Sequence, residues 1–286
     1  MTGTSSRPAQ TAKTSQYREL AQRTGSALVL ATIAGLLTYA GLWPFTFMVA
    51  AGSAILAWEW GRLVRQATLD AGFIIHAATA IATCIVAATG SGWTAFLVLV
   101  AGTCAAALAT HKLHTRAWSA FGVLYLGLPG LLLVLFRADQ AYGIAAILFL
   151  FLVVWSADTA AYFTGRALGG PKLAPGISPG KTWSGFAGGL AVPTLLSYGY
   201  ALWLGGTSAV ILALAGAALA LSSQIGDLVE SSIKRTFHVK DAGQLLPGHG
   251  GLFDRVDGLI GAVLAAGVIV YFRDFLNAGR ALLIWP

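Results

Sequence analysis

Residues 141–164 read AYGIAAILFLFLVVWSADTAAYFT, an apolar run whose only charged residue is Asp158. As an α-helix, such a run is long enough to cross the hydrocarbon core of a bilayer, which is about 30 Å thick. The whole 286-residue chain has the same character, because 57% of it is hydrophobic and only 10% is charged. Ordinary soluble domains carry roughly 25% charged residues, so the soluble, disordered and disulfide-stapled secreted classes are excluded. The composition predicts an all-α polytopic membrane protein.

Further apolar segments of similar length lie on both sides of this run, and together they predict about nine transmembrane helices. The expected spans are 26–42, 44–61, 71–89, 92–110, 117–136, 141–164, 183–204, 207–226 and 257–273. Residues 1–25 are polar and lack the apolar core of a cleavable signal, so we expect them to form a cytosolic tail.

The basic residues orient these helices. With nine spans and a cytosolic N-terminus, one side of the membrane receives fifteen Lys and Arg residues, and the other receives only Arg137, Arg273 and Arg280. Cytosolic loops are expected to carry such a basic excess. The excess also accounts for the net charge of +7. We expect no nucleic-acid binding, since no basic run with interleaved aromatic residues is present.

This orientation divides the chain into three parts with different expected roles. Residues 1–25 form the tail, and residues 26–136 form N-terminal helices that serve packing and lipid contact. Residues 137–286 form a catalytic membrane domain, in which the polar connections 165–182 and 227–256 both face the cytosol.

The acidic residues indicate that the chemistry belongs to the C-terminal part. Five of the 11 acidic residues fall in one short stretch, namely Asp227, Glu230, Asp241, Asp254 and Asp257. In the N-terminal part, Trp58-Glu59-Trp60 is interpreted as an aromatic belt at the bilayer edge, which is ordinary for a membrane protein.

The acidic stretch has the residue types of a cation and phosphate site. If the eighth span continues as a helix past Asp227, one helix face carries Ser223, Asp227, Glu230 and Lys234. Asp254 and Asp257 share a face at the start of the last span, and carboxylates are the ligands that Mg²⁺ prefers. The alternative is a set of salt bridges in a solvated loop, but ionisable groups at membrane depth are usually functional.

A second polar constellation surrounds the connection 165–182. Asp158 lies inside an apolar span, about two turns from its cytosolic end. We expect Ser178, Pro179 and Gly180 to form a rigid turn, with Lys181 starting the next helix. Such a turn can direct N–H groups, an ammonium and hydroxyls at a phosphate. The pattern is equally compatible with ordinary loop architecture.

These segments together resemble a known enzyme family. Residues 231–257 read SSIKRTFHVKDAGQLLPGHGGLFDRVD, which resembles the signature of the phosphatidate cytidylyltransferases, or CDP-diacylglycerol synthases. The segments SQIGD at 223–227, DTAAYFTGR at 158–166 and KLAPGISPGKT at 172–182 are similar to the same family. The chain departs from it at Ser184, where the family commonly has Glu, and at Gly258, where it commonly has Ser.

The resemblance implies that CTP and phosphatidate are converted to CDP-diacylglycerol and pyrophosphate with Mg²⁺, and with a second cation as an open alternative. It implies Asp227 and Asp254 as metal ligands, with Asp257 and Asp241 next. The basic residues that would orient phosphates are Lys234, Arg235, Lys240 and Arg255. Further substrate contacts are expected from Ser178, Lys181, Ser223, His249, Gly250 and Asp158.

Two alternatives of different classes stay open. Intramembrane acids such as Asp158 and Asp227 also occur in ion-coupled transporters. Another CTP-dependent lipid enzyme, of the polyprenol or phytol kinase type, would use similar groups. The family resemblance suggests a homodimer in the plasma membrane of a bacterium with the active site facing the cytosol, whereas the apolar faces are equally compatible with a monomer.

Overall fold

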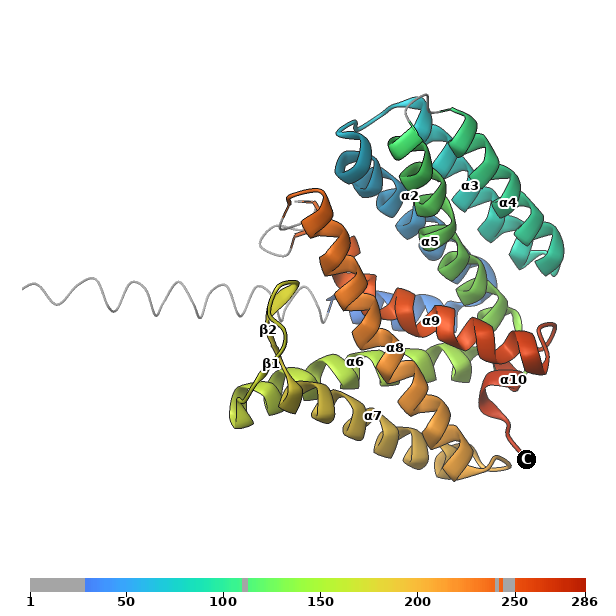
Figure 1. Cartoon of the computed structure of the whole chain (residues 1–286). Coiled ribbons are helices and arrows are strands. Elements are labelled where there is room, and N and C mark those ends of the chain that lie inside the picture. The colour runs from blue at the N-terminus through green and yellow to red at the C-terminus, as the bar shows by residue number, and fades with distance from the viewer. Residues whose placement is uncertain (1–28, 110–112, 240–241, 244–249) are drawn as a thin grey trace, which may run out of the picture.

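The computed structural model describes residues 29–109, 113–239, 242–243 and 250–286, which are almost entirely helical (Figure 1). The first group of helices is α2 (Leu42–Arg65), α3 (Ala71–Ala88), α4 (Gly92–Leu108) and α5 (Leu113–Ala138), preceded by a helical segment Val29–Ala40. The second group is α6 (Gly143–Leu168), α7 (Trp183–Leu204), α8 (Ala209–Thr236), α9 (Phe253–Arg273) and the short α10 (Ala278–Leu283).

The all-α membrane architecture predicted from composition is confirmed. Each of the nine expected spans overlaps a helix in the described part of the chain. Six of these helices are long and apolar enough to cross a membrane, namely α2, α3, α5, α6, α8 and α9, while Val29–Ala40 and α4 are shorter apolar helices.

The connection between α6 and α7 differs from the prediction. It is a β-hairpin in which β1 (Lys172–Ala174) pairs antiparallel with β2 (Ser178–Thr182), and the turn lies at 175–177. Lys181 therefore lies on a strand and does not start a helix. Helix α7 begins one residue after Thr182, whose side chain accepts a hydrogen bond from the Gly185 N–H (3.1 Å) and caps the helix.

A close crossing of α8 and α9 positions the candidate site. A Cβ atom added to Gly226 would lie 2.5 Å from the Asp257 carbonyl oxygen, and one added to Gly261 would lie 2.2 Å from the Ser222 carbonyl oxygen. Small residues let helix backbones approach closely within membranes. The two helices therefore meet at the level of Asp227 and Asp257, which places these carboxylates on facing helices.

Candidate active site

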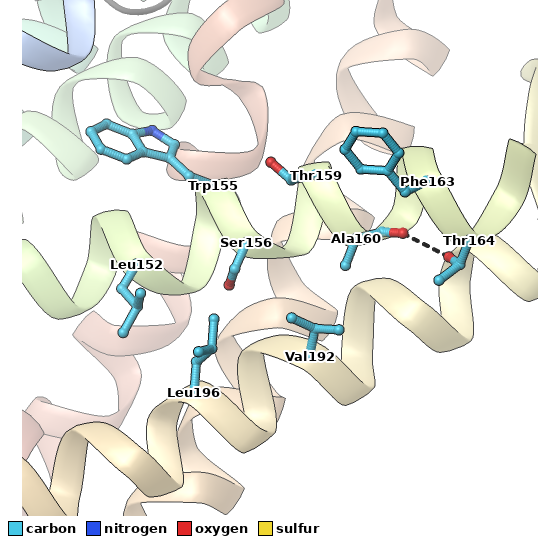
Figure 2. Close-up of a pocket in the computed structure, with 9 residues that line it drawn as sticks. All are labelled: Leu152, Trp155, Ser156, Thr159, Ala160, Phe163, Thr164, Val192 and Leu196. Carbon is cyan, nitrogen blue, oxygen red and sulfur yellow. Dashed lines mark hydrogen bonds between the residues drawn. The ribbon is translucent and has the colours of Figure 1, made fainter. Parts of the chain in front are cut away.

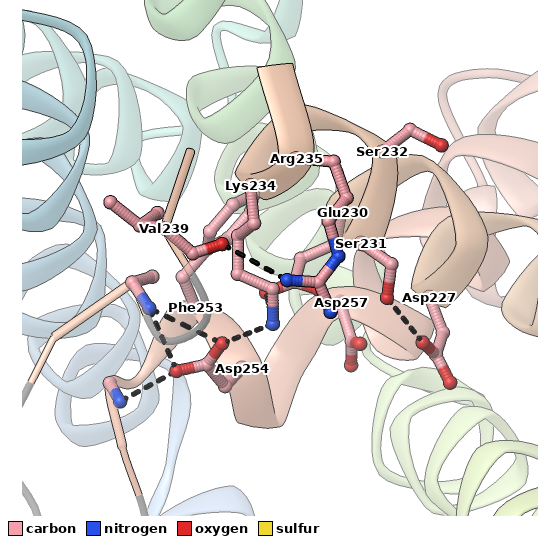
Figure 3. Close-up of polar contacts among 12 residues, drawn as sticks. Asp227, Glu230, Ser231, Ser232, Lys234, Arg235, Val239, Phe253, Asp254 and Asp257 are labelled. Atoms are coloured by element: carbon pink, nitrogen blue, oxygen red, sulfur yellow. Dashed lines mark hydrogen bonds and ion pairs between the residues drawn. The ribbon is translucent and has the colours of Figure 1, made fainter. Parts of the chain in front are cut away.

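The α8–α9 crossing assembles a group of three carboxylates, which we call the carboxylate cluster (Figure 3). Asp227 and Glu230 come from neighbouring turns of α8, and Asp257 comes from the start of α9. One oxygen from each lies within 4.8 Å of the others. Glu230 is buried, and the other two are partly buried. Like charges at this separation repel one another, so the cluster needs nearby positive charge.

Two lysines supply part of that charge. Lys181 Nζ, on β2, lies 2.7 Å from Asp227 Oδ2, and thus joins the hairpin to α8. Lys234 Nζ lies 2.7 Å from both Glu230 Oε1 and Asp254 Oδ1. The two polar constellations found in the sequence therefore meet at one place in the fold.

Asp158 adds a further carboxylate to this place. It lies on α6, close enough to interact electrostatically with Asp227, Asp257 and Lys181. With Glu230 and Asp254 included, five carboxylates surround two lysines, which leaves an excess of negative charge when all are ionised. Such an excess of oxygen ligands suits a hard divalent cation.

Asp254 has a different environment from the carboxylate cluster. Its Oδ1 accepts a hydrogen bond from Lys234, and its Oδ2 accepts from the backbone N–H groups of Gly251 (2.8 Å) and Ala242 (3.2 Å). Figure 3 shows these bonds converging on its carboxylate. Asp254 thus ties the loop before α9 to α8. The expected pairing of Asp227 with Asp254 on one metal stays a prediction, since the oxygens that the structure gathers belong to Asp227, Glu230 and Asp257.

The remaining predicted residues fall into three sets. Ser223 is buried next to the cluster, Ser178 lies on β2, and Gly250 has a left-handed φ of 79°. Arg235 and Arg255 are exposed, and Arg235 donates to the Val239 carbonyl oxygen (3.3 Å). The predicted residues Lys240, Asp241 and His249 lie outside the described residues.

The two departures from the family pattern have local structural consequences. Ser184 Oγ donates to the Gly169 carbonyl oxygen and lies 3.0 Å from Thr182 Oγ1, so it closes the base of the hairpin. Gly258 faces Ser223: a Cβ atom at position 258 would lie 2.6 Å from the Ser223 Oγ. The buried Ser223 hydroxyl has no hydrogen-bond partner within the described residues.

The sequence placed Glu230 on the acidic helix face but not among the expected site residues, and it gave no indication of Tyr125. The signal for Glu230 was its spacing, three residues after Asp227 and four before Lys234 on one helix face. Tyr125 comes from α5, and its buried hydroxyl has no partner among the described residues. It interacts electrostatically with Asp257 and Glu230. These residues are far apart in the sequence, so no local pattern predicts the interaction.

The interpretation of Trp58-Glu59-Trp60 as an aromatic belt was wrong for its last two residues. Trp60 is buried, donates to the Trp118 carbonyl oxygen (3.0 Å) and packs against Phe253 with ring centroids 5.9 Å apart. Glu59 is also buried and contacts the start of α9. Glu59 and Trp60 therefore belong to the contact between the two groups of helices, and do not form part of a lipid-facing belt.

An apolar groove of about 540 Å³ lies between α6 and α7 (Figure 2). Asp158 falls within the stretch of α6 that lines it. Its lining residues are Leu152, Trp155, Ser156, Thr159, Ala160, Phe163, Thr164, Val192 and Leu196. Each helical residue is rotated about 100° from the one before it, which puts Asp158 on another face of α6. The groove is therefore separate from the carboxylates.

The carboxylates and lysines gathered in this helical membrane protein are groups that can bind a cation and phosphates. Residues 21–273 match the model of the cytidylyltransferase family. The chain is 46% identical to a phosphatidate cytidylyltransferase of Brucella suis over 83% of its own length and 88% of the relative. It is 45% identical to the Brucella abortus protein of that name over 88% of this chain and 95% of the relative, and 39% identical to the Pseudomonas aeruginosa one over 85% and 94%.

The chain therefore belongs to the cytidylyltransferase family and is a nucleotidyltransferase.

Proposed function

We propose that this protein transfers the cytidylyl group of CTP to phosphatidate, giving CDP-diacylglycerol and pyrophosphate for phospholipid synthesis. The observation that carries the proposal is the ion pair between Lys181 and Asp227 (2.7 Å). It joins the two segments that resemble the family at one carboxylate-rich point within a membrane protein. The relatives named phosphatidate cytidylyltransferase, which align over most of this chain, support the same reaction.

The carboxylate cluster fits Mg²⁺ as the cofactor. The three oxygens within 4.8 Å of one another belong to carboxylates, the ligand type that this ion prefers. When bound, the ion would neutralise the charge of the nucleotide phosphates and of the departing pyrophosphate. The surplus of carboxylates around Asp158 is also compatible with a second cation.

The chain's own basic residues would orient the two anionic substrates. Lys181 and Lys234 are held beside the cluster by ion pairs, and the exposed Arg235 and Arg255 can approach phosphates from the outer side. Ser178, Ser223 and Gly250 are proposed as further substrate contacts, with Lys240, Asp241 and His249 from outside the described residues.

Catalysis in this proposal consists mainly of positioning and charge neutralisation. A phosphatidate oxygen attacks the α-phosphorus of CTP, and the bond to pyrophosphate breaks on the far side. A phosphate monoester has a second pKa near about 6, so the attacking oxygen is already largely ionised at neutral pH. A general base is therefore unnecessary.

The proposal includes nine spans, a cytosolic N-terminus and a site facing the cytosol of a bacterial plasma membrane. Its support is the fifteen-to-three distribution of basic residues. Residues 137–286 would carry the chemistry and residues 26–136 would mainly pack. We retain the homodimer suggested by the family resemblance, which a mass measurement in detergent would test.

Labelled CTP distinguishes this function from the alternatives. The purified protein is incubated with phosphatidate, Mg²⁺ and CTP labelled either at the α- or at the γ-phosphate. We expect the α-label to enter the lipid and the γ-label to leave as pyrophosphate. Transfer of the γ-label to a lipid acceptor would instead identify a kinase, and absence of transfer with both labels would contradict the proposal.

A further inference from the structure

Glu59 is a buried carboxylate on α2, in the group of helices expected from the sequence to serve packing and lipid contact. It is 1% exposed. Its Oε1 accepts a hydrogen bond from the Leu252 N–H (2.8 Å), and its Oε2 accepts one from the Phe253 N–H (2.8 Å). These two N–H groups belong to the N-cap residue of α9 and to its first residue, which lie 193 and 194 positions further along the chain.

This contact is stronger than ordinary packing. The first N–H groups of a helix have no partner within the helix, and they form its electropositive end. A carboxylate that accepts two of them satisfies both donors through charge-assisted hydrogen bonds. An unpaired carboxylate is expensive to bury at membrane depth, so Glu59 depends on these donors as much as they depend on it.

The surrounding residues are shaped to admit this carboxylate. A Cβ atom added to Gly251 would lie 2.6 Å from Glu59 Oε1, and one added to Gly243 would lie 2.7 Å from the same oxygen. Both glycines therefore let the backbone at residues 243 and 251 pack directly against Glu59. The edge-to-face contact of Trp60 with Phe253 holds the same helix start from an adjacent position.

The start of α9 that Glu59 holds also carries the polar residues of the site. Gly251, next to the two donors, donates its N–H to Asp254 Oδ2, and Asp254 Oδ1 accepts from Lys234. Asp257 follows one turn later and belongs to the carboxylate cluster. A rotation or axial shift of α9 would move Asp254 and Asp257 together, because both lie in its first two turns.

We propose that Glu59 is a positioning residue, which fixes the start and rotation of α9 and thereby sets the distance of Asp257 from Asp227 and of Asp254 from Lys234. Glu59 does not touch substrate in this proposal and acts through α9. Its effect on turnover rests on the proposed cytidylyl transfer, whereas its effect on α9 can be measured without that reaction.

The test compares Glu59→Gln with Asp139→Asn. Gln keeps the size of Glu but has only one acceptor oxygen, so one α9 N–H loses its partner. Asp139 is a matched control, because its carboxylate also joins two elements, by accepting from the N–H groups of Ala141, Tyr142 and Arg280, which lie away from the carboxylate cluster.

The first readout is amide hydrogen exchange over residues 250–258 of the full chain in nanodiscs. We expect Glu59→Gln to accelerate exchange at Leu252 and Phe253 by about tenfold or more, and Asp139→Asn to leave it unchanged. The second readout is steady-state kinetics. We expect kcat to fall about tenfold to a hundredfold, since a shift of about 1 Å in catalytic groups has an effect of this size, with KM for CTP little changed. Glu59→Asp, which keeps the charge, should recover part of both losses.

Unchanged exchange at Leu252 and Phe253, or accelerated exchange with wild-type kcat, would overturn the positioning role. A wild-type protein that makes no CDP-diacylglycerol would contradict the proposed function, and the exchange comparison would still test the hold of Glu59 on α9. If Glu59→Gln does not fold, Gly251→Ala replaces it, since its Cβ would displace the same contact while Glu59 is kept; normal exchange and kcat in that variant would count against the proposal.

Discussion

The two ends of the helix bundle differ in what surrounds their carboxylates. At the end formed by residues 137–143 and 273–285, carboxylates are bound by backbone N–H groups. Asp139 accepts from Ala141, Tyr142 and Arg280, and Asp274 accepts from Leu276 and Asn277. At the end where α8 meets α9, three carboxylates instead face one another within 4.8 Å.

This difference distinguishes carboxylates that stabilise the fold from carboxylates that are available to bind a ligand. A carboxylate that accepts several N–H hydrogen bonds already has fixed dipoles around it and needs no ion. Carboxylates that face one another repel. Lys181, Lys234 and the Gly258 N–H each bind one carboxylate of the cluster, and the three still present oxygens towards one point, as a bound cation requires. Asp254 and Glu59 lie near the carboxylate cluster but accept backbone N–H hydrogen bonds like the first type.

The largest effect is expected at the carboxylate cluster. Asp257→Asn and Asp227→Asn each remove a charged oxygen ligand with little change in shape, so turnover should fall by more than about a hundredfold. The Mg²⁺ concentration that gives half-maximal turnover should be higher for both single variants than for the wild type. The double variant should lose little more than either single one, because groups that act as a unit fail together.

Asp254→Asn extends this experiment to the pairing predicted from the sequence. If Asp254 shares the ion with Asp227, their double variant should be non-additive and each should shift the Mg²⁺ dependence. If Asp254 acts through its bonds to Lys234, Gly251 and Ala242, its loss should multiply with that of Asp227 and leave the Mg²⁺ dependence unchanged. The second result would separate Asp254 from the metal ligands.

The sequence predicts features that depend on neighbouring residues better than contacts between distant segments. The helices follow from apolar length, and the shared face of Asp227, Glu230 and Lys234 follows from helical spacing, so both could be predicted. The helix position expected for Lys181 was wrong, because a hairpin of 3 and 5 residues has no strong local pattern. The contact of Glu59 with α9 spans 193 residues. The only sequence signal for it was an acidic residue within an apolar segment, since such residues are usually functional.

Lys181→Gln tests whether the hairpin belongs to the site end. The change breaks the 2.7 Å ion pair with Asp227. The negative charge of that carboxylate then lacks the lysine that neutralised it. We expect turnover to fall by about a hundredfold, in line with about 1.5–3 kcal/mol for a hydrogen bond to a charged group. Lys172→Gln, on the exposed part of β1, is the matched control and should stay near wild type. Equal effects of the two changes would remove Lys181 from the site.

Arg235→Ala should have a smaller effect than Lys181→Gln. Arg235 is exposed and bonded only to the Val239 carbonyl oxygen (3.3 Å) among the contacts described for its side chain. If it meets substrate phosphate, turnover should fall about tenfold while the thermal unfolding temperature stays constant. Wild-type turnover in the folded variant would limit Arg235 to its contact at the end of α8, and the boundary of the site would then lie at Lys234.

Asp274→Asn should have the smallest effect on activity, and its effect on stability should depend on pH. Hydrogen bonds from the Asn277 side chain and backbone hold the pKa of the Asp274 carboxyl below its usual value. A carboxylate whose pKa is lowered by folding stabilises the folded state above its unfolded pKa, and this contribution is lost as the pH falls through the folded pKa. The unfolding temperatures of wild type and Asp274→Asn should therefore differ at about pH 7 and converge towards about pH 3.

Turnover of Asp274→Asn at pH 7 should change by less than about twofold, as for other exposed substitutions away from a site. A large loss of turnover in this variant would break the comparison, because it would mean that charge at the far end of the bundle also serves the reaction.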